Sequence, residues 1–331
     1  MLRIHIVLCL LAAAACSSRS TTRSSAESGA VAQAPITTSG AIARRNLDAR
    51  IAGLERAGRR AALVDLLLAR AEFFGSFADY DRALNSAEDG VELAPDDAAA
   101  YQLRGRVRSR LHRWDEALAD FDRAEQLGDT AAALAPHRAA IMEARGRVAQ
   151  ARTQRALTTP SPTGRAALAR AAGNRVHAVE QYEDALRRHR GVSPFPVAWL
   201  YMQLGLLHEE LGDDATARAS YQAAVERLPG YHAATVHLAE LEHRIGANGD
   251  AAARLRPLLE VSDDPEIAGH LAAWTGDAEL LARATAGFSD LEQRHQLAIA
   301  HHAAEFWRNA GADPQRAQRL TAIDAANRRP D

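Results

Sequence analysis

The stretch Ala198–Tyr231, AWLYMQLGLLHEELGDDATARASYQAAVERLPGY, decides the fold. It holds two apolar segments of helical length, and Gly212 stands between them. Glycine reaches the left-handed conformation that commonly ends a helix, and Pro229 cannot continue the second helix. Gly205 and Ala217 are small residues at the positions where two antiparallel helices would cross. A larger side chain there would push the helices apart. The stretch therefore predicts a helical hairpin.

The same residue types return at a fixed spacing elsewhere in the chain. Ala83 precedes Ala117 by 34 residues, and Ala217 precedes Ala251 by the same 34. A fixed period in this range indicates stacked supersecondary units. From Ile42 onward apolar residues recur at helical spacing, without the alternation that marks strands. The pattern predicts an all-α chain of stacked helix pairs.

The period and residue types resemble the tetratricopeptide repeat family, whose signature ends in an Ala-x3-Phe segment and a Pro. The resemblance implies an all-α, right-handed α-solenoid of roughly six to seven antiparallel helix pairs, with a concave groove that binds a protein or peptide. The copy at 98–131 is nearly as complete as the copy at 198–231. The positions that carry the repeat are Tyr101, Gly105, Ala117, Phe121, Tyr201, Gly205, Ala217, Tyr221 and Pro229.

The chain is expected to divide into three parts. Residues 1–16 form a signal peptide, 17–38 a Ser/Thr/Ala-rich disordered tether, and 39–331 the repeat domain. Clear repeats are expected at 64–97, 98–131, 198–231 and 232–265, with degenerate units at 132–197 and 266–331.

The first sixteen residues predict an exported protein. A basic start is followed by the apolar run Ile4–Ala15 and then by Cys16. Small residues before a Cys resemble the bacterial lipoprotein cleavage box, which implies that Cys16 carries a lipid anchor. The box usually has Leu where Ala13 stands, and cleavage near Ala15 without lipidation is the alternative. The expected location is the cell envelope, with membrane contact only through this anchor.

Composition excludes several functions. The formal net charge is −2, which argues against a nucleic-acid binder that neutralises phosphates. All 40 basic residues are Arg, so the Lys of a phosphate-binding loop cannot be supplied. The catalytic motifs GxSxG and HExxH are missing as well. We therefore expect a non-enzyme without cofactor or metal, whose partner is a protein or peptide of the envelope.

One candidate binding surface is the arginine-rich first helix of the 98–131 repeat. By family register, Gln102, Arg106 and Arg110 face the concave groove, where they could recognise an acidic peptide. The alternative, which nearby acids favour, is that the run Arg104–Arg113 pairs internally. The acids within reach on neighbouring helices are Glu72, Glu88, Asp89, Glu92 and Asp120.

A second candidate is the groove side of the 198–231 repeat. Trp199, Met202, Leu206 and Glu210 follow the concave register and could form an amphipathic peptide-binding strip. Packing of this strip against Phe195–Pro196 is an equally good interpretation.

Histidines are the remaining candidates for chemistry. His301 and Glu305 are four residues apart on one helix face beside His302, but a metal there needs a third ligand from another helix. We therefore predict no metal site. Two alternatives to the adaptor function stay open: a metal-dependent enzyme or regulator built on these histidines, and a structural spacer whose groove is closed by its own N-terminal segment.

Overall fold

The computed structural model describes residues 35–328. Cys16, the predicted signal peptide and most of the predicted tether lie outside the described residues. Within the described part the chain is all-α, with a first helix followed by eight antiparallel pairs. The helices are α1 Gly40–Arg56, α2 Arg60–Phe74, α3 Phe77–Leu93, α4 Ala98–Arg110, α5 Trp114–Gln126, α6 Ala131–Ala144, α7 Val148–Ala156, α8 Pro162–Ala171, α9 Arg175–Arg188, α10 Pro194–Glu210, α11 Asp214–Arg227, α12 His232–Arg244, α13 Asn248–Leu255, α14 Pro265–Thr275, α15 Ala278–Arg294, α16 Gln296–Arg308 and α17 Pro314–Asn327, with the 3₁₀ turn Arg256–Glu260 after α13.

This arrangement confirms the predicted solenoid of antiparallel helix pairs. Eight pairs are present where six to seven were expected, because 132–197 and 266–331 each accommodate two short pairs. No helix in the described range has both the length and the apolar character needed to cross a bilayer.

Small residues set the distance between paired helices, as the sequence predicts. A Cβ on Gly205 would lie 2.4 Å from the ring of Tyr221, and one on Gly105 would lie 2.7 Å from the ring of Phe121. Both separations are far below van der Waals contact, so each glycine lets an aromatic ring of the second helix pack against the first. Gly212 has a φ of 77° just after α10, which is the left-handed helix end expected there.

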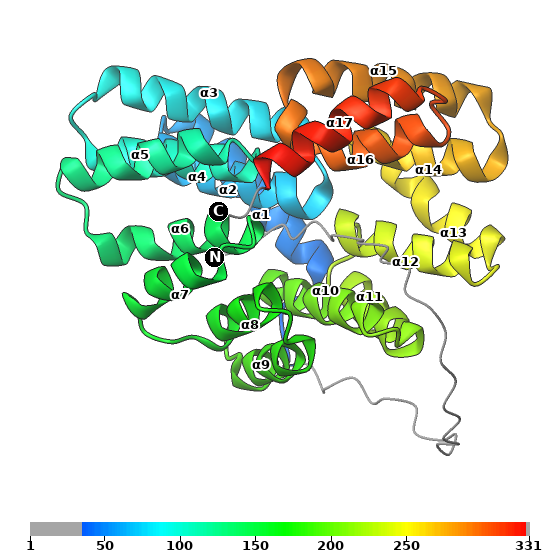
Figure 1. Cartoon of the computed structure of the whole chain (residues 1–331), viewed down its shortest axis with the longest axis horizontal. Helices are drawn as coiled ribbons and strands as arrows, with labels where there is room; N and C mark the ends of the chain where they lie inside the picture. Colours follow the sequence, from blue (N-terminus) through cyan, green and yellow to red (C-terminus); the bar gives the residue numbers. More distant parts are fainter. Residues whose placement is uncertain (1–34, 329–331) are drawn as a thin grey trace.

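The first helices of successive pairs form the inner layer of the solenoid. Contacts between these first helices join α2 to α4, α4 to α6, α6 to α8, and α14 to α16. Helix α1 packs against both α2 and α10, and it runs through the middle of the molecule (Figure 1). The centre of the inner face is therefore filled by the chain's own N-terminal helix.

The curvature brings the two ends of the solenoid together along a closure seam. The carboxylate of Asp263 accepts hydrogen bonds from the backbone N–H groups of Phe77 (2.6 Å) and Ala78 (2.8 Å) at the start of α3. At the far end of the seam, Asn327 Nδ2 donates to the carbonyl of His112 at 2.9 Å. Figure 1 shows α14–α17 folded back beside the N-terminal pairs.

Candidate functional site

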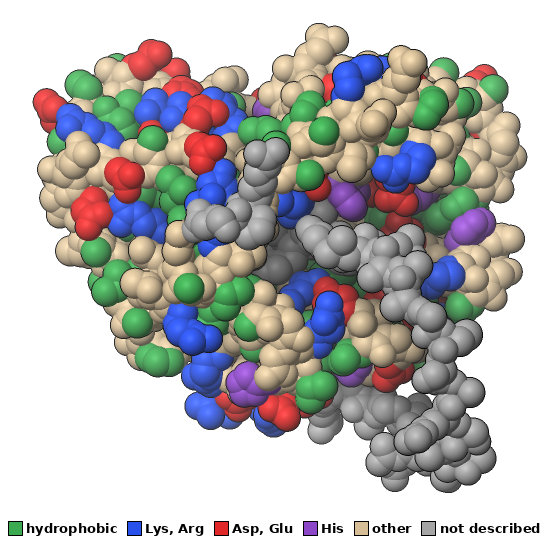
Figure 2. Space-filling view, in the orientation of Figure 1, with side chains coloured by type: hydrophobic (Ala, Val, Ile, Leu, Met, Phe, Trp, Pro, Cys, Tyr) green, Lys and Arg blue, Asp and Glu red, His purple; other side chains and the backbone are tan. Residues whose placement is uncertain are grey.

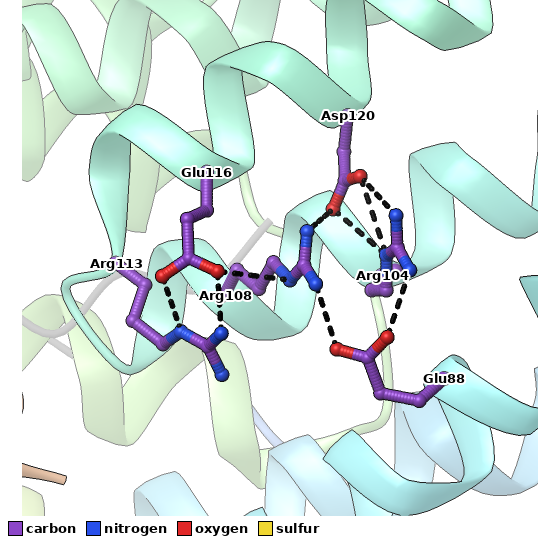
Figure 3. Close-up of polar contacts among 6 residues, drawn as sticks. All are labelled: Glu88, Arg104, Arg108, Arg113, Glu116 and Asp120. Carbon is purple, nitrogen blue, oxygen red and sulfur yellow. Dashed lines mark hydrogen bonds and ion pairs between the residues drawn. The ribbon is translucent and has the colours of Figure 1, made fainter.

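The arginine run on α4 is held in an internal network. Arg104 and Arg108 both reach from α4 to Asp120 on α5, at 2.7 and 2.9 Å, and both reach Glu88 on α3, at 2.8 Å (Figure 3). Arg113 pairs with Glu116 beside them. We call these six residues the arginine network.

Burial explains why the network needs two arginines. The side chain of Asp120 is only 4% exposed, and a buried carboxylate is costly unless cations and hydrogen bonds surround it. Burial by itself raises the pKa of Glu88, but the hydrogen bonds from Arg104 and Arg108 outweigh that effect and lower it. The network therefore stabilises the packing of α3, α4 and α5.

The two arginines expected to face the groove are also paired internally. Arg106 lies 2.5 Å from Asp65 on α2, and Arg110 lies 2.8 Å from the buried Glu72 on the same helix. Gln102, the third predicted groove residue, is half-buried. Internal pairing of the run is therefore confirmed, although two partners, Asp65 and Glu116, differ from those expected, and the structure gives no pairing of Asp89 or Glu92 with the run.

The predicted peptide-binding strip on α10 is part of the core. Trp199, Met202 and Leu206 are 4%, 3% and 1% exposed, so in this structure they offer no surface to a partner. Trp199 packs edge-on against Tyr182 of α9, with ring centroids 5.6 Å apart. The expectation of an exposed strip is wrong, because α10 is apolar on all sides and is covered by α9, α11 and α1.

The other members of that region also have internal partners. Glu210 at the end of α10 accepts hydrogen bonds from Arg170 and, at 2.8 Å, from Arg175. Phe195, the alternative packing partner for the strip, instead has its ring 4.8 Å from that of Phe73 on α2. The neighbours of α10 thus come from the preceding pair, α8 and α9, and from the first pair of the chain.

A different group of side chains gathers on the inner helices of the C-terminal half. His302 Nδ1 of α16 lies 2.5 Å from Glu266 Oε1 of α14, and His270 Nε2 of α14 lies 3.3 Å from Glu240 Oε1 of α12. His232 Nε2 at the start of α12 lies 3.5 Å from Asp264 Oδ2. We call His232, Glu240, Asp264, Glu266, His270 and His302 the histidine–carboxylate cluster.

The cluster differs from the site considered in the sequence. His301 points elsewhere, with Nδ1 3.8 Å from Asp324 Oδ2 of α17, and Glu305 is exposed. The histidine of α16 that meets the acids of the cluster is His302, whose partner Glu266 stands on α14. Spacing within α16 therefore gave no signal for this contact.

The carboxylates of the cluster favour positive charge on two of its histidines, His302 and His270. Burial lowers the pKa of His302, but the Glu266 carboxylate outweighs burial and raises it to about 10. Burial likewise opposes charge on His270, yet Glu266 and Glu240 raise its pKa to about 9. Burial raises the pKa of Asp264, which has the weaker compensation.

Part of the cluster remains open to solvent. The side chain of His302 is 32% exposed and that of Glu240 is 33% exposed. Figure 2 shows histidine (purple) and acidic (red) side chains on the walls of the hollow between α16 and α12. Among residues 35–328, the acids of the cluster pair with histidines and no arginine forms an ion pair with them.

Residues 200–229 match the family model described as the tetratricopeptide repeat. The chain carries a tetratricopeptide repeat. Several solved structures contain a solenoid of this kind. A monomeric mutant of IFIT1 with Gppp-AAAA is 14% identical, with a TM-score of 0.50 over 86% of this chain and 76% of that one. A tetratricopeptide repeat protein from Parabacteroides merdae is 13% identical, with a TM-score of 0.43 over 85% and 98%.

The type IV pilus biogenesis factor PilW is 18% identical, with a TM-score of 0.31 over 70% of this chain and 92% of that one. None of the curated proteins compared with the sequence matches it. At these identities the likeness concerns the repeat solenoid alone.

Proposed function

We propose that this repeat solenoid is a non-catalytic scaffold that binds a protein or peptide on the inner face of α12, α14 and α16. The observation that carries the proposal is the partial exposure of the histidine–carboxylate cluster on the inner helices. The rest of the inner face is less available, since α10 is buried and the arginines of α4 are paired. A repeat scaffold binds its partner through side chains that are exposed on its inner face.

The charge of this face points to a partner with basic side chains. Four carboxyl groups, from Glu240, Asp264, Glu266 and Glu305, stand beside the two histidines whose pKa is raised, and those of Glu240 and Glu305 reach solvent. Complementary charge speeds encounter and fixes the register of a bound segment. The proposed partner is therefore a protein whose docking segment carries Arg or Lys.

Site-specific photocrosslinking tests this proposal. A photoreactive residue at Glu305 of α16 would stand on the inner face, and one at Ala286 of α15 would stand on the outer helix of the preceding pair. We expect a specific crosslinked protein from cells with the probe at 305 and none with the probe at 286. Crosslinks at 286 alone, or at neither position, would contradict an inner-face scaffold.

We further propose that the protein is exported and anchored in the bacterial cell envelope through a lipid on Cys16. The apolar run before Cys16 and the small residues next to it support this. Wild-type protein is expected to take up a labelled fatty acid and to sediment with membranes, whereas Cys16→Ser is expected to do neither. Equal sedimentation of both forms without label would exclude the anchor.

A further inference from the structure

One histidine of the cluster is buried without a hydrogen-bond partner for its ring nitrogen. His232 is only 7% exposed, and its Nε2 makes no hydrogen bond to any described residue. Asp264 Oδ2 lies 3.5 Å from this nitrogen, which is too long for a strong hydrogen bond. A buried nitrogen left in this way is costly unless another species binds it.

The spacing around this nitrogen fits a metal ion. His232, Asp264 and Glu266 each offer one ligand atom, and these three atoms lie within 4.8 Å of one another. Nitrogen and oxygen ligands bound about 2.1 Å from a tetrahedral metal are about 3.4 Å apart. The separation of 3.5 Å between His232 Nε2 and Asp264 Oδ2 is close to that value.

Neighbouring groups hold all three ligands in place. Asp264 Oδ1 accepts a hydrogen bond from the backbone N–H of Glu266 at 3.0 Å, which leaves Oδ2 turned towards His232. The His232 ring packs over Gly75, where a Cβ would lie 2.5 Å from the ring. His302 holds the Glu266 carboxylate by a hydrogen bond of 2.5 Å, which is how outer groups orient metal-binding side chains.

We propose that His232, Asp264 and Glu266 bind a divalent transition-metal ion of the Zn²⁺ type. One imidazole and two carboxylates suit such an ion, whereas Mg²⁺ and Ca²⁺ prefer oxygen ligands alone. The ion joins the start of α12 to the start of α14, beside Gly75 and the Asp263 contact of the closure seam. Its binding therefore ties α12 to α14 beside the seam and stabilises the folded chain.

Calorimetric titration of tag-free, chelator-treated full-length protein with Zn²⁺ tests the proposal. We expect one saturable site per chain that Mg²⁺ does not fill, together with a rise in melting temperature on adding Zn²⁺. Asp264→Asn keeps the oxygen that caps α14 but loses the charge, and His232→Gln removes the imidazole. Each variant removes a ligand and should weaken Zn²⁺ binding by at least the roughly ten- to hundredfold that loss of an outer hydrogen-bonding partner costs.

His243→Gln is the matched control, because His243 lies on the same helix but stacks on Trp274 with ring centroids 4.6 Å apart. It should bind Zn²⁺ as the wild type does. The proposal is overturned if Zn²⁺ shows no saturable binding, or if His232→Gln and Asp264→Asn, both folded by circular dichroism, bind it as tightly as His243→Gln.

Discussion

The arginine network and the histidine–carboxylate cluster solve the same packing problem with different cations. Each places carboxylates between neighbouring helices of the solenoid. In the network the cations are guanidinium groups, which stay charged and donate hydrogen bonds to the carboxylate oxygens. In the cluster they are imidazoles, which can lose a proton, bind a metal or exchange their partner. The dense arginine run in this chain thus stabilises helix packing. The sparser histidines form the site that can change its protonation or its ligand.

The largest expected effect is the loss of the buried carboxylate of the network. Asp120→Asn leaves Arg104 and Arg108 facing an uncharged side chain, and we expect the free energy of unfolding to fall by about 3 kcal/mol. Urea denaturation at pH 7 measures it. Asp89→Asn, an exposed change on α3, should stay within about 0.5 kcal/mol. Equal stabilities of the two variants would show that the network does not stabilise helix packing.

A second effect depends on pH and comes from the turn that follows the arginine helix. Burial lowers the pKa of His112 from 6.5 to about 3. Below pH 6.5 the unfolded chain binds a proton that the folded chain does not. This contribution is therefore complete above pH 6.5 and is lost, at about 1.4 kcal/mol per pH unit, as the pH falls towards 3.

His112→Asn tests this, since Asn tolerates the φ of 56° at this position. The stability of wild type relative to the variant should decline between pH 6.5 and 4, measured by denaturation at each pH. A difference that does not change with pH would mean that His112 is not kept neutral by burial.

On the histidine side, a smaller loss is expected from His302→Gln. The amide can still donate to Glu266 but carries no charge, so the free energy of unfolding should fall by about 1 kcal/mol. Chemical denaturation near pH 7 in the presence of a chelator measures this without metal. His301→Gln, which loses a 3.8 Å contact with Asp324 and a ring contact with His302, is the control and should change less. A larger loss of stability in His301→Gln than in His302→Gln would show that the stabilising contact belongs to His301.

The smallest effect belongs to the exposed edge of the arginine run. Arg106 and Asp65 are 31% and 48% exposed, so Arg106→Gln should cost less than about 1 kcal/mol, and less still at high salt. Denaturation at low and high salt checks both statements. A loss as large as that of Asp120→Asn would mean that exposure does not distinguish the two kinds of pair.

The fold could be predicted from the sequence because its signals are local. Gly205 and Tyr221, or Gly105 and Phe121, are close in sequence and pack in one hairpin. The family register assigns Trp199 to the groove, whereas α10 is covered by its neighbours α9 and α11 and also by α1 from the start of the chain, so its burial was not predicted. Its apolar character on every side was the available signal.

The cluster could not be predicted for a related reason. His232, Glu266 and His302 stand on three different helix pairs, and their meeting depends on the curvature of the solenoid. The arginine run stands out in the sequence only by its density, and the density of arginines does not show whether their side chains are paired.

The affinity of the crosslinked partner for two double variants tests most directly whether binding belongs to the histidine side. His302→Gln with Glu305→Gln alters the open inner face of α16, and Gln102→Ala with Arg106→Gln alters that of α4. The first pair should weaken binding by about tenfold, equal to about 1.4 kcal/mol, and the second should leave it within about twofold. A strong loss of affinity in the α4 double variant, with none in the α16 double variant, would contradict the assignment of binding to the histidine side.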